Sequence, residues 1–330
     1  MNNMLFWEFV HENLQAGEPL LLLLVVDSGG SSPGKAGFKM AVTASGPSHG
    51  SIGGGIMERE LAGQAVEQLA RGRARPRLLK LLHHEGADAA GKRSGMICSG
   101  WQRIALLPLG RGDAGAVDSL LFALKRNRPG LLQFTPAGMG FRPGNQQAAA
   151  VTFRCRSDDD WAYREQAGLR PTVTIIGGGH VGLALSRVMA GLDFHVRVLD
   201  DREGLETMEA NAFAQEKHVV NYKNMGKNVG AGGGNYAVIM TFGHQADEIV
   251  LKQLVGKKLR YLGMLGSPAK VAQIFASLKK QGVAAAGLKK VHAPVGLPIH
   301  SHTPEEIAVS IAAEIISIKN QPKGTVKSER

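Results

Sequence analysis

The stretch Thr174-Ile175-Ile176-Gly177-Gly178-Gly179-His180-Val181-Gly182 decides the fold. Its glycines stand where an apolar strand pattern changes to a helical pattern, and this context gives the spacing G-x-G-x-x-G its meaning. Gly177 is expected to make the tight turn, Gly179 to let a pyrophosphate approach the backbone, and Gly182 to let helix and strand pack closely. A second strand pattern ends at Asp200, where dinucleotide-binding folds carry an acidic partner for a ribose hydroxyl. The stretch therefore predicts a Rossmann-like domain with an anion site at the start of its first helix.

The second half of the chain continues this alternation, which is typical of a parallel sheet covered by helices on both faces. Ser267, directly after the last expected strand, is a candidate donor to a phosphate group. His180 is the titratable residue nearest to the glycines, and its purely structural role would be to cap the helix start. Strands are expected at 173–176, 194–199, 218–221, 237–242 and 261–265, and helices over 247–254, 268–281 and 303–318.

The first half is predicted to be a mixed α/β domain whose strand order cannot be read from the pattern. Its clearest strand is the apolar run 20–26, which follows a helix-like stretch at 5–15. A polar segment with a proline, 157–171, separates the two halves, so we expect two domains, 1–165 and 166–330. Further strands are expected at 38–43, 104–108, 131–134 and 148–153, and helices over 56–71 and 120–126.

Composition excludes several classes of protein. The 330 residues are 44% hydrophobic and 20% charged, which argues against disorder, collagen and coiled coil. The net charge of +11 favours anionic partners, but aromatic residues make up only 5% and no nucleic-acid-binding motif occurs, so no nucleic-acid partner is expected. The run 20–26 is too short to span a bilayer and lacks the features of a signal peptide, so no membrane span is expected. Two cysteines are too few for a disulfide framework, which favours a cytoplasmic location.

Two further glycine-rich loops lie in the first half. Gly53, Gly54 and Gly55 run directly into a helix pattern, which makes the start of that helix a second candidate anion site. Glu58, in its first turn, admits two interpretations: it stabilises the helix dipole, or it binds a polar edge of a ligand. The earlier loop adds hydroxyl groups and the ammonium group of Lys35, without the residue order of a Walker A loop.

Two more residues also admit opposite interpretations. Cys98 lies among small residues just before an apolar strand, so it is either an accessible thiolate or a small buried side chain. Asp200 favours a nucleotide with a free 2′-hydroxyl over one with a 2′-phosphate, a preference that Arg202 weakens. The Rossmann-like domain itself either binds a nucleotide or has lost that site.

Together these motifs resemble the XdhC/CoxI family of xanthine dehydrogenase accessory proteins. The resemblance covers most of the chain and is weakest at about 110–165. The family's cysteine is usually followed by two glycines, whereas Ser99 and Gly100 follow Cys98 here. The motifs that carry the resemblance are Gly29-Gly30-Ser31-Ser32-Pro33, Lys39-Met40, Gly50 to Glu58, the quoted glycine stretch, Asp200-Asp201-Arg202, Thr241 with His244 and Asp247, the segment from Tyr261 to Ser267, His292-Ala293-Pro294-Val295-Gly296 and the segment from Thr303 to Glu314.

The resemblance implies an XdhC/CoxI domain followed by a Rossmann domain, and a homodimer. It also implies a non-catalytic chaperone that holds the molybdenum cofactor while a cysteine desulfurase supplies its sulfido ligand. The chaperone then delivers the cofactor to an apo molybdenum hydroxylase of the xanthine dehydrogenase type. Gly53–Gly55, Lys35 or the 177–182 loop would hold the phosphate of the cofactor, and the soft thiolate of Cys98 would bind its molybdenum.

Two competing hypotheses remain from the residues alone. The first is an NAD(P)-dependent oxidoreductase that uses the Rossmann loop, although the sequence provides no convincing acid–base pair for hydride transfer. The second is a basic scaffold protein whose ligand sites are vestigial.

Overall fold

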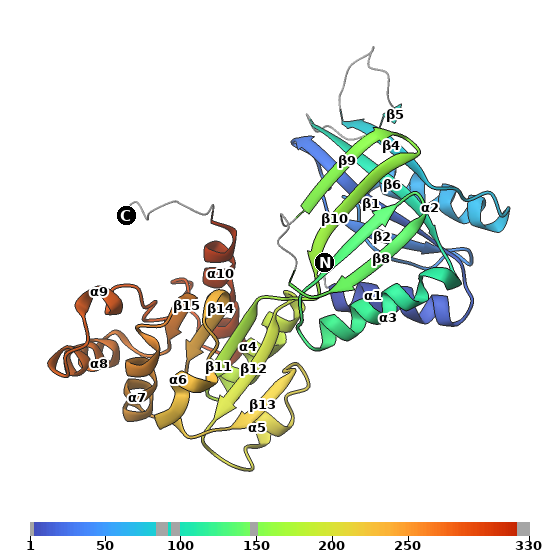
Figure 1. The fold of residues 1–330 in the computed structure, drawn as a ribbon. Helices are drawn as coiled ribbons and strands as arrows, with labels where there is room; N and C mark the ends of the chain where they lie inside the picture. Colours follow the sequence, from blue (N-terminus) through green and yellow to red (C-terminus); the bar gives the residue numbers. More distant parts are fainter. Residues whose placement is uncertain (1–2, 84–91, 94–99, 146–150, 322–330) are drawn as a thin grey trace. The chain divides into compact units, whose positions relative to one another are not determined.

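The chain divides into two compact units, Met1–Leu169 and Arg170–Arg330 (Figure 1). The computed structural model describes residues 3–83, 92–93, 100–145 and 151–321. Within these ranges, no helix is long and apolar enough to cross a membrane.

A six-stranded sheet, in the order β3-β2-β1-β6-β4-β5, forms the centre of the first unit. Its central strand β1 pairs antiparallel with both β2 and β6. Alternate residues of β1 enter two different core clusters, one on each face of the sheet, so the whole apolar run is buried. This confirms the strand expected at 20–26. The strands are β1 (Leu20–Gly30), β2 (Lys39–Thr43), β3 (Ser48–Gly50), β4 (Arg77–His83), β5 (Lys92–Arg93) and β6 (Gly100–Leu109).

Helix α2 (Gly55–Ala70) covers one face of this sheet. The other face packs against α1 (Asn3–Gln15), α3 (Ala114–Lys125) and the inner face of a second sheet. That second sheet has four strands in the order β8-β7-β10-β9. They are β7 (Gly130–Thr135), β8 (Gly138–Pro143), β9 (Val151–Ser157) and β10 (Asp160–Ala167).

Strand β10 lies within the polar segment expected to separate the two halves. Trp161 and Tyr163 are buried in the core of the first unit, whereas the exposed residues Asp160, Arg164 and Gln166 are polar. The polar residues hid the strand because they make up its solvent-facing side. The chain then divides between Leu169 and Arg170.

The second unit contains a five-stranded sheet in the order β13-β12-β11-β14-β15, and every adjacent pair is parallel. This confirms the Rossmann-like fold class. The strand order reverses between β11 and β14, and ligands of such sheets bind beyond the carboxyl ends of the strands at this point. The strands are β11 (Thr172–Ile176), β12 (His195–Asp200), β13 (Glu216–Val219), β14 (Gly232–Ile239) and β15 (Leu259–Met264).

Helices cover both faces of the parallel sheet. Helices α4 (His180–Gly191) and α10 (Pro304–Asn320) share one core cluster. Helices α7 (His244–Leu254) and α8 (Pro268–Lys280) share the other. The short helices are α5 (Glu206–Glu209), α6 (Met225–Asn228) and α9 (Ala285–Leu288).

Candidate functional site

In the first unit, the loop that precedes α2 is organised by one carboxylate. Glu58 Oε2 accepts hydrogen bonds from the Ser51 hydroxyl (2.7 Å), the Ile52 N–H (2.8 Å) and the Gly54 N–H (2.9 Å). Gly54 has a φ of 78°, a conformation that favours glycine. Glu58 therefore binds the protein's own loop, and two N–H groups that an anion would need are already used.

A buried glutamine joins this loop to the earlier glycine-rich loop. The Gln102 side-chain oxygen accepts from the Ser32 hydroxyl (3.1 Å) and the Gly34 N–H (3.2 Å), and its amide nitrogen donates to the Ile52 carbonyl (3.3 Å). The two loops touch through backbone, since a Cβ on Gly34 would lie 2.1 Å from the Ile52 carbonyl oxygen. The side chain of Gln102 is fully buried. It therefore positions both loops at once.

The first turn of α2 is the part of this loop that stays open to a ligand. The first N–H groups of a helix have no intrahelical acceptor. Gly55 and Ile56 are exposed there, and Ile56 is 59% accessible. Lys35 is also exposed, with its ammonium group 3.3 Å from the Gly30 carbonyl oxygen. Cys98, the expected molybdenum ligand, lies outside the described residues.

In the second unit, three glycines shape the loop between β11 and α4. A Cβ on Gly177 would lie 2.2 Å from the Met240 carbonyl oxygen, and a Cβ on Gly182 would lie 2.2 Å from the Gly177 carbonyl oxygen. A Cβ on Gly179 would have no neighbour within 4 Å. Gly177 and Gly182 thus permit close packing, while Gly179 leaves the start of α4 open. His180 is the first residue of α4 and is exposed.

Asp200 ends β12 and is completely buried. Its Oδ2 accepts from the Gly178 N–H (2.7 Å) and from Arg202 Nη2 (2.8 Å), and its Oδ1 accepts from Arg202 Nε (2.8 Å) and the Arg202 N–H (3.0 Å). Burial alone would raise the pKa of Asp200, but these hydrogen bonds hold it below its ordinary value. A ribose hydroxyl could bind Asp200 only by displacing Arg202. The carboxylate that was expected to select a free 2′-hydroxyl is therefore already occupied by donors of the protein.

Arg202 also approaches an exposed aromatic ring. Its guanidinium carbon lies 5.8 Å from the ring centroid of Phe242, and Phe242 is 86% accessible. Phe242 follows β14 and Arg202 follows β12, so both lie at the carboxyl edge of the parallel sheet. An accessible ring and a guanidinium group at this edge can stack against a planar ligand.

A buried ion pair holds the loops that follow β14 and β15. Asp247 is fully buried, and its Oδ1 accepts from the Thr241 hydroxyl (2.6 Å) and N–H (3.0 Å). Its Oδ2 lies 2.5 Å from Lys270 Nζ. The Ser267 hydroxyl accepts from the Lys270 N–H (3.3 Å) and caps α8. Ser267 is thus a helix cap whose hydroxyl hydrogen can still be donated to a ligand.

Glu314 on α10 forms hydrogen bonds with the segment that follows β15. It lies 2.8 Å from His292 Nδ1 and accepts from the Tyr261 hydroxyl (2.6 Å) and the Gly296 N–H (2.9 Å). Burial would raise the pKa of Glu314, but its hydrogen bonds with His292 and Tyr261 lower it. These contacts indicate a structural role for Glu314. Over the described ranges, no group of three or more His, Cys, Asp or Glu residues could hold a metal ion.

Two family models match the chain. Residues 173–315 match the XdhC Rossmann domain, and residues 13–83 match the XdhC and CoxI family. The chain belongs to the XdhC/CoxI family. The glycine loop of α2 falls in the matched region of the first unit, and the carboxyl edge of the parallel sheet falls in that of the second. The open starts of α2 and α4 both lie within the matched segments.

Three known proteins are similar to this chain in sequence or in fold. The uncharacterised protein YqeB of Escherichia coli K12 is 27% identical over 310 residues, which cover 93% of this chain and 44% of YqeB. A probable xanthine dehydrogenase subunit from Bacillus subtilis 168 is 27% identical over 152 residues, 46% of this chain and 44% of that protein. The chain thus spans less than half the length of these curated relatives. A crystal structure of a xanthine dehydrogenase from Bacillus halodurans has the same fold, with a TM-score of 0.73, 20% identity and 98% coverage of both chains.

Gln102 and Lys270 were not predicted to form part of a site, whereas Arg202 was expected to affect Asp200, and Asp247 belongs to a motif of the resemblance. Gln102 carried a signal, because it is a polar residue next to a strongly apolar strand pattern. Arg202 follows Asp200 by two residues, a spacing that permits a local ion pair. Asp247 and Lys270 lie far apart in the sequence, so only the fold brings them together.

Proposed function

We propose that this chain binds the molybdenum cofactor and delivers it to an apo molybdenum hydroxylase of the xanthine dehydrogenase type. The observation that carries the proposal is the open first turn of α2, which Glu58 and Gln102 hold in place. Family membership supports this role, and the name of the Bacillus subtilis relative supports the class of client. The proposal includes a cysteine desulfurase as the sulfur donor, a homodimer, and a cytoplasmic setting.

The residues of the first unit fit the phosphate group of this cofactor. A phosphate needs N–H donors and positive charge, and the exposed start of α2 offers N–H groups at the positive end of a helix of 16 residues. Lys35 provides the positive charge, because it follows Gly34 in the chain and Gly34 packs against the loop that precedes α2. The bound cofactor would supply the molybdenum centre of the client enzyme. The chain's own residues hold the phosphate, and Cys98, as a thiolate, would hold the metal.

A charge placed in this turn tests the proposal. Ile56→Glu adds a carboxylate among the open N–H groups, where it suits the helix dipole but repels a phosphate. Gly63→Glu adds the same charge seven residues later, on the same side of α2, and a Cβ there meets nothing within 4 Å. Purified protein is incubated anaerobically with released cofactor and filtered by size, and protein-bound molybdenum and pterin are quantified.

We expect retention to fall at least ~10-fold in Ile56→Glu and to stay at the wild-type level in Gly63→Glu. Cys98→Ala should lose molybdenum while the start of α2 stays intact. Wild-type protein that retains no cofactor would overturn the proposal. Equal retention by Ile56→Glu and wild type would remove the start of α2 from the site.

A nucleotide-dependent oxidoreductase is the second candidate. The open backbone at Gly179 favours it, together with the accessible ring of Phe242. The four donors already bound to Asp200 count against NAD as its cofactor. Calorimetric titration with NADH and NADPH tests this candidate, and the absence of heat with both nucleotides would exclude it.

A further inference from the structure

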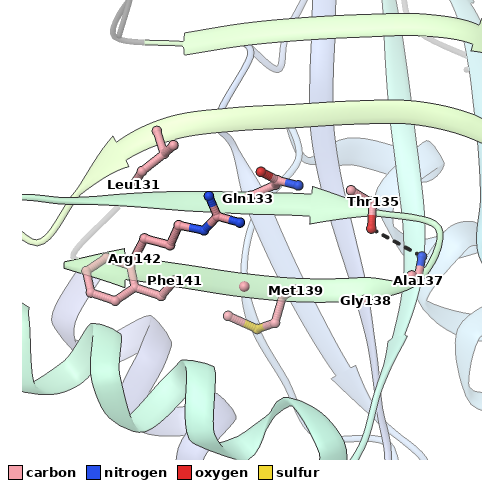
Figure 2. A pocket seen from close by; sticks show the side chains of 9 residues that line it. Leu131, Gln133, Thr135, Ala137, Gly138, Met139, Phe141 and Arg142 are labelled. Atoms are coloured by element: carbon pink, nitrogen blue, oxygen red, sulfur yellow. Dashed lines mark hydrogen bonds between the residues drawn. The ribbon is translucent and has the colours of Figure 1, made fainter. Parts of the chain in front are cut away.

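The outer face of the hairpin β7–β8 carries a hollow that the proposed function does not use. Side chains alternate strictly across this hairpin, with Leu132 and Phe134 buried in the core. The opposite face presents three cross-strand pairs: Leu131 with Arg142, Gln133 with Gly140, and Thr135 with Gly138. Figure 2 shows the residues that line the hollow, with Arg142 of the outer face lying toward Leu131 and Gln133. The hollow has a volume of about 290 Å³.

The fold does not require a glycine at position 140. Gly140 has no positive φ, and a Cβ built on it meets no atom within 4 Å. Gly138 differs, because it has a φ of 123° and a Cβ there would lie 2.9 Å from Asp113 Oδ1. Glycine within a strand weakens that strand and often marks the close approach of a ligand. Gly140 therefore keeps the floor of the hollow open at a cost in strand stability.

Three side chains around this floor, those of Gln133, Thr135 and Arg142, have hydrogen-bond donors available. The Gln133 oxygen accepts from Arg164 Nε at 3.0 Å, and because a guanidinium group only donates, the amide NH₂ of Gln133 stays available. The Thr135 oxygen accepts from the Ala137 N–H at 3.3 Å, so its hydroxyl hydrogen is available too. Arg142 is exposed and has no ion-pair partner among the residues that the structure describes.

We propose that this hollow binds a small anionic molecule with a short apolar body, whose carboxylate or phosphate group is held by Arg142, Gln133 and Thr135. Leu131 forms an apolar wall beside these donors, which suits an aliphatic group next to the anion. The site lies outside both segments matched by the family models. It is independent of the molybdenum cofactor and of the start of α2.

Four probes separate the features of such a ligand. Hexanoate and hexyl phosphate combine an anion with an apolar chain, hexanol lacks the anion, and inorganic phosphate lacks the chain. We expect calorimetry of the full chain to show hexanoate or hexyl phosphate binding at least ~10-fold more tightly than hexanol and than inorganic phosphate. Hexanol that binds as well as hexanoate would overturn the proposal, and so would the absence of binding by both amphiphilic anions.

Two variants place the binding in this hollow. Gly140→Val fills the floor with a good strand former, so the protein should fold and melt at or above the wild-type temperature while the probe affinity falls at least ~10-fold. Arg142→Gln should lower the affinity for both anions by a similar factor without changing the melting temperature. The control is Arg156→Gln, which should bind the probes like the wild type. Arg156 is an exposed arginine that lies 3.7 Å from Asp160. Unchanged affinity in both Gly140→Val and Arg142→Gln would place the binding elsewhere and overturn the proposal.

Discussion

The two glycine loops bind an acidic side chain in different ways. In the first unit, Glu58 comes from the same helix that the loop precedes, and it accepts from the loop without any cation. In the second unit, Asp200 comes from the neighbouring strand, and Arg202 neutralises it while Gly178 donates to it. The first loop is organised locally, whereas the second depends on the register of β11 and β12.

This difference determines how each loop can receive an anion. The N–H groups of Ile52 and Gly54 are used by Glu58, so an anion meets only the first turn of α2. At the Rossmann loop only Gly178 is used by Asp200, and the open side of Gly179 stays accessible. A glycine-rich loop before a helix is therefore a site for a ligand only to the extent that the protein leaves its donors unused.

The largest expected effect comes from breaking the second loop. Asp200→Ala leaves Arg202 without its partner and the Gly178 N–H without its acceptor in a buried position. We expect a loss of about 3 kcal/mol in the free energy of unfolding, at the low end for a buried pair because the Arg202 side chain is 40% accessible. Urea denaturation measures this loss. A loss below about 1 kcal/mol would contradict the structural role assigned to Asp200.

A smaller effect is expected for the first loop. Glu58→Ala removes the acceptor for three donors whose hydrogen bonds are only partly buried, and water can replace the carboxylate in part, so we expect a loss of about 1–2 kcal/mol. The freed loop N–H groups should also increase the affinity for inorganic phosphate. Urea denaturation and phosphate titration test the two effects, and Glu60→Ala on the same helix is the control. Unchanged phosphate affinity would indicate that the loop closes without Glu58.

The smallest effect is a pH dependence specific to the second loop. The pKa of Asp200 is lower in the folded protein than its ordinary value. Its stabilising contribution is therefore fully present above the ordinary pKa and is lost as the pH falls through the folded pKa. We expect the stability difference between wild type and Asp200→Asn to be larger at pH 7 than at pH 3. Melting temperatures of both proteins at the two pH values measure it, and a difference that grows toward pH 3 would contradict it.

Most of the fold could be predicted from local patterns. The apolar run 20–26 was sufficient to predict a buried strand, and the glycine stretch at 177–182 was sufficient to predict a Rossmann-like domain in the second half. The strand β10 was missed because its exposed residues, Asp160, Arg164 and Gln166, are all polar. The start of β14 was missed because Gly232, Gly233 and Gly234 have no side chains to show a strand pattern. The order of the strands in the first unit depends on long-range pairing, for example of β1 with β6, which no local pattern encodes.

The sequence by itself determined which residues of the loops are the candidates for a site: the glycines, Glu58, Asp200 and Lys35. This information is local, because backbone conformation and helix starts depend on neighbouring residues. The tertiary structure alone decided which donors and acceptors remain free. Asp200 is saturated by Arg202 and Gly178, and the two loops of the first unit meet through Gln102. Hydrogen bonds between distant segments form only when folding brings them together, and they settle which of the candidate groups can meet a ligand.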